Sequence, residues 1–209
     1  MPRLKLAVLL SGNGTTLENL FEKSASGAMN AEVAVVLSSR ADAFGLERAR
    51  RRNVPALTIP RKQFKTPDDF SAALFAALAP FKVDLICCAG FMSLFRVPTE
   101  FEHCIINVHP ALLPSFGGKG FYGHHVHEAV LAHGCKVSGC TVHYVDNVYD
   151  NGPIIAQSVV PVLDTDIPDT LGARVQQAER EIYPQVIQWI AEGRIKIVNR
   201  VVTVCPKGS

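Results

Sequence analysis

Two polar residues interrupt an apolar segment, Ile105-Ile106-Asn107-Val108-His109-Pro110, in a way that could support proton transfer. In an extended strand, Asn107 and His109 would point to the same face because they are two residues apart. An amide beside an imidazole can stabilise an oxyanion and move a proton. Open α/β sheets bind ligands at the carboxyl ends of their strands, which favours this interpretation over a histidine that only satisfies a backbone carbonyl.

Two acidic residues lie in the segment Asp146-Asn147-Val148-Tyr149-Asp150-Asn151-Gly152, which separates two further apolar segments. A carboxylate near His109 would orient the imidazole and stabilise its charged form. Asp150-Asn151-Gly152 leads into the second apolar segment, which places Asp150 at the edge of the core. Spacing alone leaves Asp146 as an alternative.

A segment rich in glycine and threonine, Ser11-Gly12-Asn13-Gly14-Thr15-Thr16, follows the first apolar segment and precedes a helical pattern. Glycines let the backbone approach a ligand, and the amides of such a turn favour an anion. The segment lacks the third glycine of the dinucleotide fingerprint and the lysine of a P-loop, so a phosphate monoester is a better candidate than NAD or ATP. A tight turn that binds nothing is the alternative.

The other histidines and the cysteines do not predict a metal site. The segment His124-His125-Val126-His127 is rich in histidine, but these positions do not share a face of a helix. The six cysteines form no Cys-x-x-Cys pair, which favours reduced thiols in a cytoplasmic protein.

The elements that position these residues alternate between strands and helices. Apolar segments predict strands at 4–10, 32–38, 54–59, 83–88, 104–108, 137–145 and 154–160. Helical spacing predicts helices that begin at 15 and that cover 43–52, 67–80, 125–133 and 168–191, the last kinked at Pro184, with a terminal hairpin or tail at 195–204. This order predicts a single α/β domain, Rossmann-like, with a mostly parallel twisted sheet flanked by helices.

Composition limits the classes of partner. The chain has 209 residues and is 48% hydrophobic, which predicts one well-packed domain and excludes disorder. Lys and Arg number 21 against 19 for Asp and Glu, so the net charge of +2 argues against a nucleic-acid binder. The apolar stretches are too short to span a membrane. We therefore expect small-molecule substrates.

These motifs, in this order, resemble the formyltransferase family that uses 10-formyltetrahydrofolate, and the branch acting on glycinamide ribonucleotide is the most similar. Asn107-Val108-His109-Pro110-Ala111-Leu112-Leu113-Pro114 is similar to the family's most specific motif. Gly139-Cys140-Thr141-Val142-His143-Tyr144-Val145, followed by Asp150-Asn151-Gly152, is similar to its active-site signature. Ala89-Gly90-Phe91-Met92 is similar to the turn that holds the pterin. The resemblance covers nearly the whole chain.

The resemblance implies a role for each matched residue. The implied catalytic residues are Asn107, His109 and Asp150, which favours Asp150 over Asp146. The implied contacts to glycinamide ribonucleotide are Gly12, Asn13, Gly14, Thr15, Thr16 and Glu179. The implied folate contacts are Arg61, Met92, Ser93, Leu94, Phe95 and Asn107, although relatives often have an arginine where this chain has Ser93-Leu94-Phe95.

The implied reaction is transfer of a formyl group from 10-formyltetrahydrofolate to the amine of glycinamide ribonucleotide in purine biosynthesis. Folate would be a co-substrate, with no tightly bound cofactor and no metal. Residues 1–209 would form one formyltransferase domain, in which about 1–100 bind phosphate and about 101–200 bind folate and carry catalysis. The resemblance leaves a homodimer open.

Three other functions are alternatives to formyl transfer to glycinamide ribonucleotide. A formyltetrahydrofolate deformylase would hydrolyse the formyl group but carries an extra N-terminal domain, which we do not expect because the first strand begins at Leu4. A methionyl-tRNA formyltransferase carries an added C-terminal RNA-binding domain, which we also do not expect. A non-catalytic module could sense a nucleotide or folate, but intact Asn107, His109 and Asp150 argue against it.

Overall fold

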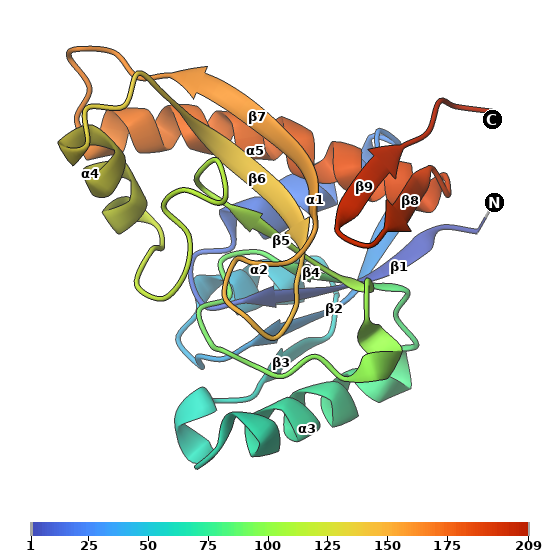
Figure 1. The fold of residues 1–209 in the computed structure, drawn as a ribbon. Helices are drawn as coiled ribbons and strands as arrows, with labels where there is room; N and C mark the ends of the chain where they lie inside the picture. The colour runs from blue at the N-terminus through green and yellow to red at the C-terminus, as the bar shows by residue number, and fades with distance from the viewer. Residues whose placement is uncertain (1, 209) are drawn as a thin grey trace. The chain divides into compact units, whose positions relative to one another are not determined.

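The structure is a computed structural model that describes residues 2–208. The chain forms two compact units, Met1–Ile106 and Asn107–Ser209. In chain order, the first unit contains β1 (Leu4–Leu10), α1 (Thr15–Ala25), β2 (Ala31–Ser38), α2 (Phe44–Arg51), β3 (Ala56–Thr58), α3 (Pro67–Leu78) and β4 (Leu85–Cys88) (Figure 1). Strand β5 (Ile105–His109) begins at the end of this unit.

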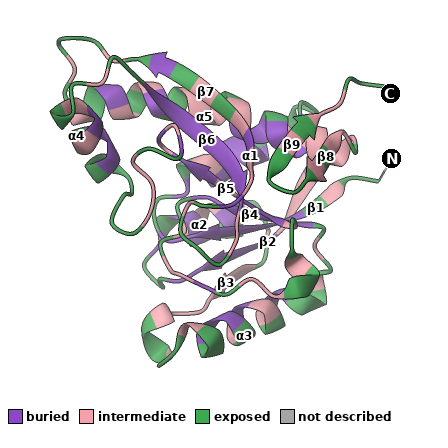
Figure 2. Ribbon diagram, viewed as in Figure 1, coloured by how far each residue is buried: buried purple, intermediate pink, exposed green. Residues whose placement is uncertain are grey.

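The strands of the first unit are all parallel. Strand β1 pairs with β2 on one side and with β4 on the other, and β2 pairs with β3. Residues 6–10 of β1 are fully buried, as expected for a strand covered on both faces (Figure 2). The carboxyl ends of β1 and β4 are therefore neighbours, and the turns that follow these two strands lie next to each other.

The second unit contains α4 (His124–Ala132), β6 (Val137–Tyr144), β7 (Ile154–Pro161), α5 (Pro168–Ala191), β8 (Ile195–Val198) and β9 (Val201–Val204). Strands β6 and β7 are antiparallel, and α5 packs against both of them. Figure 2 shows β6 buried along most of its length, whereas exposed and less exposed residues alternate along β7. Strands β8 and β9 form a separate hairpin.

The fold class predicted from the sequence is confirmed: the main sheet has the strand order β3-β2-β1-β4-β5-β6-β7, is mostly parallel and is flanked by helices. Most boundaries differ from the prediction by one or two residues, and two of these differences bear on the argument. Helix α3 ends at Leu78, and a short 3-10 helix, Ala79–Phe81, takes in Pro80. Strand β5 extends to His109, one residue further than predicted, so this histidine belongs to the strand.

Gly14 shows why the first turn needs a glycine. Its φ is 70°, in the left-handed region, and a Cβ at this position would lie 2.7 Å from the Cα of Gly45 in α2. The sequence predicts that the glycines of this turn admit a ligand, and the structure corrects this for Gly14, whose missing side chain admits α2 instead. At Gly12 no atom lies within 4 Å of the Cβ that the residue would carry, so the space beside it is open.

Comparing two glycine substitutions tests this correction. Gly27 also has a positive φ, 77°, but a Cβ there would meet nothing within 4 Å. We expect Gly27→Ala to cost about 1–2 kcal/mol for the left-handed backbone alone, and Gly14→Ala to cost more because it also overlaps α2. Urea unfolding of both variants measures the difference. Equal losses would show that the contact with Gly45 relaxes freely.

Candidate active site

Four polar side chains of the second unit converge at the end of β5. Asn107 and His109 come from β5, His143 from β6, and Asp150 from the turn after β6. The Oδ1 atom of Asp150 lies 3.6 Å from Nδ1 of His109 and 3.7 Å from Nε2 of His143. The Nδ2 atom of Asn107 lies 3.2 Å from Nε2 of His143. The structure thus brings together the three residues predicted to be catalytic and adds a second histidine.

The contacts of His109 fix the direction of its ring. Its side chain is almost fully buried, and Nε2 lies 2.8 Å from the carbonyl oxygen of Phe116. A carbonyl only accepts hydrogen bonds, so Nε2 carries a proton and donates it. Nδ1 then faces the carboxylate of Asp150. A charged imidazolium would therefore have an acceptor opposite each of its two N–H groups.

His143 has the opposite role. Its side chain is 2% exposed, and burial lowers its pKa, which favours the neutral ring. Nδ1 donates to the carbonyl oxygen of Tyr144 at 2.8 Å, so Nε2 is left as an acceptor for the Asn107 amide. This contact orients the amide nitrogen of Asn107, whose second N–H and Oδ1 remain for a ligand.

Asp150 is held by its backbone and by one amide. Its φ is 50°, an uncommon value for a residue with a side chain. Its Oδ2 accepts a hydrogen bond of 2.9 Å from the backbone N–H of Gly118. Asp146 has other partners: its carboxylate accepts from the N–H of Val148 and from Nδ2 of Asn151, both at 2.8 Å. Of the two acidic residues, Asp150 is the one beside the imidazoles, and Asp146 shapes the turn.

Thr141 fixes the segment that follows β5. Its hydroxyl donates to the carbonyl of Ala111 at 2.7 Å and accepts from the N–H of Leu113 at 3.0 Å. Gln157 from β7 donates to the Thr141 hydroxyl and to the carbonyl of Leu113, both at 3.0 Å. These buried bonds anchor the beginning of the loop whose Phe116 and Gly118 contact His109 and Asp150.

In the first unit, the glycine-rich turn after β1 presents its backbone. Gly12, Asn13 and Thr15 are exposed, while Thr16 is less exposed and begins the buried face of α1. Gly14 is the N-cap residue of α1 and supplies no side chain to the helix amides. Exposed amides at a helix N-terminus suit an anion.

Ser11 joins this turn to the one after β4. Its Oγ accepts a hydrogen bond of 3.0 Å from the N–H of Met92 and lies 2.8 Å from the hydroxyl of Ser39. The two turns predicted to bind phosphate and folate are therefore linked within the first unit. The sequence prediction gave Ser11 no role, although its position before the first glycine was a usable signal.

The side chains of the residues predicted to contact folate differ in their exposure. Met92 is 52% exposed, and Ser93 and Leu94 are partly exposed. Phe95 is 5% exposed and packs its ring against those of Phe75 and Phe91, which leaves only its backbone for a ligand. Arg61 is distant from this turn in sequence. It donates to the carbonyl of Phe64 at 2.8 Å, and its guanidinium stacks over the ring of Phe70.

Glu179 lies on α5 with its carboxyl group turned into the protein. Burial raises its pKa to about 7. The pKa of the Cys140 thiol on β6 is raised to about 12, chiefly by burial and also by the negative charge of Glu179. Glu179 is half-buried, and the desolvation of its carboxyl makes ionisation costly, as is common at ligand-binding sites.

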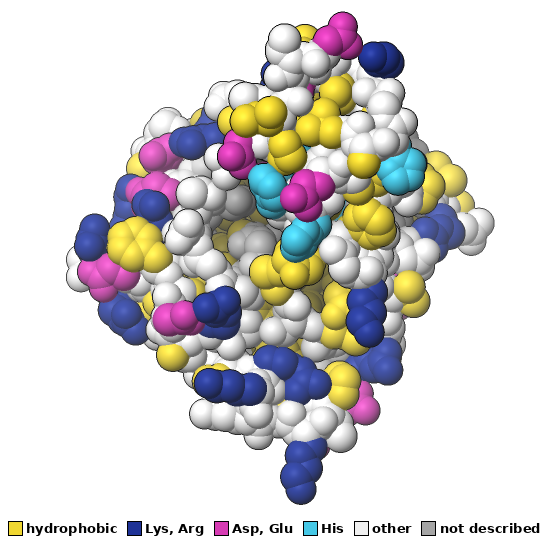
Figure 3. Space-filling model, turned by 90° about the vertical axis from the view of Figure 1, so that its left-hand side faces the viewer, with side chains coloured by type: hydrophobic (Ala, Val, Ile, Leu, Met, Phe, Trp, Pro, Cys, Tyr) yellow, Lys and Arg dark blue, Asp and Glu magenta, His cyan; other side chains and the backbone are white. Residues whose placement is uncertain are grey.

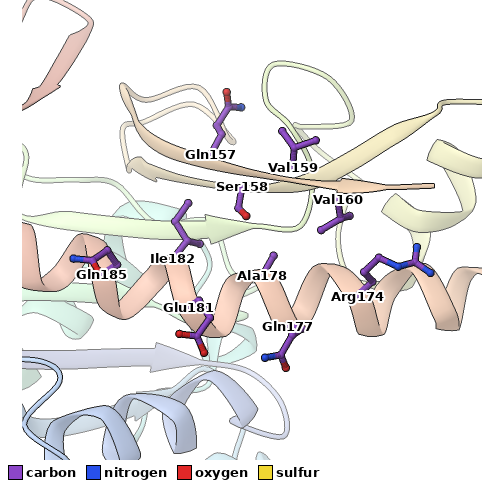
Figure 4. A pocket seen from close by; sticks show the side chains of 10 residues that line it. All are labelled: Gln157, Ser158, Val159, Val160, Arg174, Gln177, Ala178, Glu181, Ile182 and Gln185. Atoms are coloured by element: carbon purple, nitrogen blue, oxygen red, sulfur yellow. The ribbon is translucent and has the colours of Figure 1, made fainter. Parts of the chain in front are cut away.

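An open hollow of about 630 Å³ lies elsewhere in the second unit, between β7 and α5. In Figure 4, Ser158 and Val160 point from the strand toward the helix, and Ala178 and Ile182 point back toward the strand. The hollow is lined by none of the residues predicted from the sequence. None of its lining residues is a histidine, and the cluster of Asn107, His109 and Asp150 remains the candidate for the chemistry.

Surface charge adds no second site. His124 and His125 each lie within ion-pair distance of Glu128, at 3.4 and 3.0 Å, and Figure 3 shows histidine side chains next to acidic ones on the face in view. Within residues 2–208, no cluster of three or more His, Cys, Asp or Glu side chains has an arrangement suited to a metal ion. Over the same residues, no helix is long and apolar enough to cross a bilayer.

Residues 4–187 match the formyl transferase family, and the chain belongs to that family. It is similar to a solved structure of glycinamide ribonucleotide transformylase 1 from Symbiobacterium toebii, with 43% sequence identity and a TM-score of 0.91 over 98% of this chain and 95% of that one. It is also similar to the chloroplastic phosphoribosylglycinamide formyltransferase of Vigna unguiculata, with 40% identity over 197 residues.

The match to the Vigna unguiculata protein covers 92% of this chain but 62% of the relative, so the chain spans less than two thirds of that protein's length. A formyltetrahydrofolate deformylase from Pseudomonas syringae is 22% identical, with a TM-score of 0.86 over 98% of this chain and 66% of that one. This last likeness shows a shared fold only.

His143 generates the first prediction about the site. His143→Leu would remove the acceptor that orients the Asn107 amide, and a small misplacement of a reacting group can cost about 10²-fold in rate. We expect kcat to fall by about that factor with little change in KM. His143→Gln, whose side-chain oxygen can accept the same bond, should recover part of the loss. His125→Leu is the control, because the side chain of His125 is exposed on α4 beside Glu128. Similar kcat values for His143→Leu and the control would contradict this role.

Proposed function

We propose that this chain transfers the formyl group of 10-formyltetrahydrofolate to the amine of glycinamide ribonucleotide, a step of purine biosynthesis. The observation that carries the proposal is the cluster of Asn107, His109 and Asp150 at the end of β5. Membership of the formyl transferase family and the likeness to a glycinamide ribonucleotide transformylase support the choice of reaction.

The cluster suits acyl transfer to an amine. The amine attacks the formyl carbon bound to N10 of the folate, and a tetrahedral intermediate with an oxyanion forms. The N–H of Asn107 and the imidazolium of His109 stabilise this oxyanion. Asp150 balances the charge of His109 and helps to carry a proton from the attacking ammonium to the departing nitrogen, directly or through water. For His109 to donate from Nε2, the carbonyl of Phe116 must give way to the substrate.

The two substrates are assigned to separate groups of residues. Gly12, Asn13, Gly14, Thr15 and Thr16 bind the phosphate of the ribonucleotide through amides and hydroxyls, and Glu179 accepts from its ribose hydroxyls. The folate lies against Met92, Ser93, Leu94, the backbone of Phe95 and Asn107, and Arg61 meets its acidic tail. The phosphate contacts and most of the assigned folate contacts thus fall before about residue 100, and the catalytic cluster falls after it. Folate is a co-substrate in this scheme, and no resident cofactor or metal is needed.

The deformylase alternative uses the same cluster with water as the nucleophile. It is supported by a likeness of fold at 22% identity, against 43% for the transformylase. A cytoplasmic location remains the prediction from the sequence, and the Vigna unguiculata relative is named as chloroplastic.

One assay separates these activities. The purified chain is mixed with 10-formyltetrahydrofolate in the presence and absence of glycinamide ribonucleotide, and release of tetrahydrofolate is followed. We expect turnover that depends on the ribonucleotide and yields its formylated product. Equal turnover without the ribonucleotide would instead indicate a deformylase, and no turnover in either mixture would indicate a binding module.

Asp150 and Asp146 provide a matched pair of substitutions. A carboxylate that pairs with an imidazolium matters most in the transition state, where charge is greatest. Asp150→Asn keeps the size of the side chain and removes its charge, so we expect kcat to fall by about 10²–10⁴-fold with modest change in KM. Asp146→Asn, which alters only the turn, should leave kcat within a few fold. A larger loss for Asp146→Asn would show that the assignment is wrong.

Glu179 should couple pH to stability. Because its pKa is raised to about 7 in the folded chain from an ordinary value of 4.5, its stabilising effect is complete below pH 4.5 and is lost as the pH rises through 7. The side chain in Glu179→Gln is neutral at every pH. At pH 8 we therefore expect the free energy of unfolding, measured with urea, to be about 1–3 kcal/mol higher in the variant than in the natural chain. At pH 5.5 the difference should be much smaller. The same variant should bind the ribonucleotide more weakly.

The exposed Glu181 on the same helix provides the control for this measurement. Glu181→Gln should alter neither the pH dependence of unfolding nor the affinity for the ribonucleotide. If Glu179→Gln gains stability at pH 8 but binds the ribonucleotide normally, the carboxyl is buried for a reason unrelated to substrate, and its assigned contact is wrong.

A further inference from the structure

Helix α2 holds two consecutive carbonyl groups of the glycine-rich turn. The backbone N–H of Gly45, in the first turn of α2, donates to the carbonyl oxygen of Gly12 at 3.1 Å. One helical turn later, Nε of Arg48 donates to the carbonyl oxygen of Asn13 at 2.9 Å. Both bonds lie within the first unit.

These two bonds determine where the next amides point. Both peptide groups are trans, since the cis bond among the described residues is Leu113–Pro114. In a trans peptide the C=O and N–H groups point in opposite directions. With the carbonyls of Gly12 and Asn13 turned toward α2, the N–H groups of Asn13 and Gly14 are turned away from it. Successive amides on one side of a turn form a concave site for an anion.

Arg48 is itself held in place. Its Nη1 lies 3.2 Å from a carboxylate oxygen of Glu18 on α1, and its guanidinium lies 5.0 Å from the centre of the Phe44 ring. Its side chain is 27% exposed, less than half the value for Arg51 on the same helix. Glu18 also pairs with Arg52. From the sequence alone, these arginines read as a solvated end of the helix, and Arg48 departs from that expectation.

We propose that Arg48 is a positioning residue for the substrate phosphate: its Nε–H holds the Asn13 carbonyl so that the amides of Asn13 and Gly14 face the anion. The inference rests on the proposed function for the identity of the phosphate, which is a phosphate monoester. Arg48 acts through the peptide group, and its guanidinium is paired with Glu18, a carboxylate that it shares with Arg52. Without the bond from Arg48 to the Asn13 carbonyl, the ligand itself would have to order this peptide group. The free energy spent on ordering would weaken binding.

Three substitutions separate the hydrogen bond from the charge. Arg48→Met keeps an unbranched side chain but removes both donor and charge. Arg48→Gln places an N–H donor at the same distance along the side chain as Nε and removes the charge. Arg51→Met is the matched control, because Arg51 also lies over Phe44 and pairs with an acidic residue, Glu47, without contacting the turn.

The measurement is the affinity of each purified chain for inorganic phosphate and for glycinamide ribonucleotide by calorimetry, with circular dichroism to verify folding. We expect Arg48→Met to weaken binding of both ligands about tenfold, a loss typical of one charge-assisted hydrogen bond. Arg48→Gln should recover most of the affinity, and Arg51→Met should bind normally. In turnover, KM for the ribonucleotide should rise in Arg48→Met while kcat and KM for folate stay unchanged.

Two results would overturn the proposal. Affinity in Arg48→Met equal to that in Arg51→Met would show that the bond to Asn13 is dispensable. Affinity in Arg48→Gln as low as in Arg48→Met would show that the charge of Arg48 acts on the anion directly. If Arg48→Met fails to fold, NMR of the natural chain decides: the amide signals of Asn13 and Gly14 must move on addition of phosphate. Phosphate binding does not require formyl transfer. If the variants differ in phosphate affinity as expected but the natural chain shows no turnover, only the proposed function is contradicted.

Discussion

The carbonyl oxygen of Tyr144 is the group on which the geometry of the second unit's site depends. It accepts the Nδ1 proton of His143, and it leaves no room for a side chain at Gly152, where a Cβ would lie 1.8 Å away. The first contact makes Nε2 of His143 an acceptor, which in turn orients Asn107. The second brings the chain back close to the end of β6, so that Asp150, two residues earlier, faces the imidazoles. One peptide group therefore fixes both the amide and the carboxylate of the site.

In the first unit, hydrogen bonds to backbone carbonyls likewise determine the direction of the groups that face the ligand. Its turn after β1 must direct amides toward an anion, and it does so by giving the carbonyls of Gly12 and Asn13 to donors on α2. This requires α2 to lie against the turn, which is why Gly14 has no side chain: a Cβ there would lie 2.7 Å from the Cα of Gly45. In each unit a glycine is required because another backbone approaches, and the ligand-binding groups follow from that approach. Each bond contributes only about 1 kcal/mol, but together they select one conformation of a segment that contains few large side chains.

Much of this was predictable from local patterns, and the remainder was not. Continuous apolar segments located β1, β2 and β4, and the two-residue spacing of Asn107 and His109 placed both at one end of β5, because these signals depend only on neighbouring residues. The choice between Asp146 and Asp150 could not be made from spacing, since it depends on a positive φ at Asp150 and on an amide contributed by Gly118. His143 and Thr141 were visible in the sequence without a role. His143 contacts Asn107 in β5, 36 residues away in sequence, and Thr141 contacts Ala111 just after β5, 30 residues away; such pairings have no local signal. The contact of Arg48 has no local signal for the same reason, because its partner on the turn lies 35 residues earlier.

The two histidines of the site have different hydrogen-bonding roles because a backbone carbonyl accepts from a different ring nitrogen in each. His109 donates from Nε2 to a carbonyl and turns Nδ1 toward a carboxylate, so a second proton on its ring would meet a favourable charge. His143 donates from Nδ1 to a carbonyl and turns Nε2 toward an amide that can only donate, so a second proton there would meet another donor and break the contact. Burial lowers the pKa of His143 in the same direction. What separates the two imidazoles is therefore the ring nitrogen from which each neighbouring carbonyl accepts: Nδ1 of His109 is left facing a carboxylate, and Nε2 of His143 is left facing an amide.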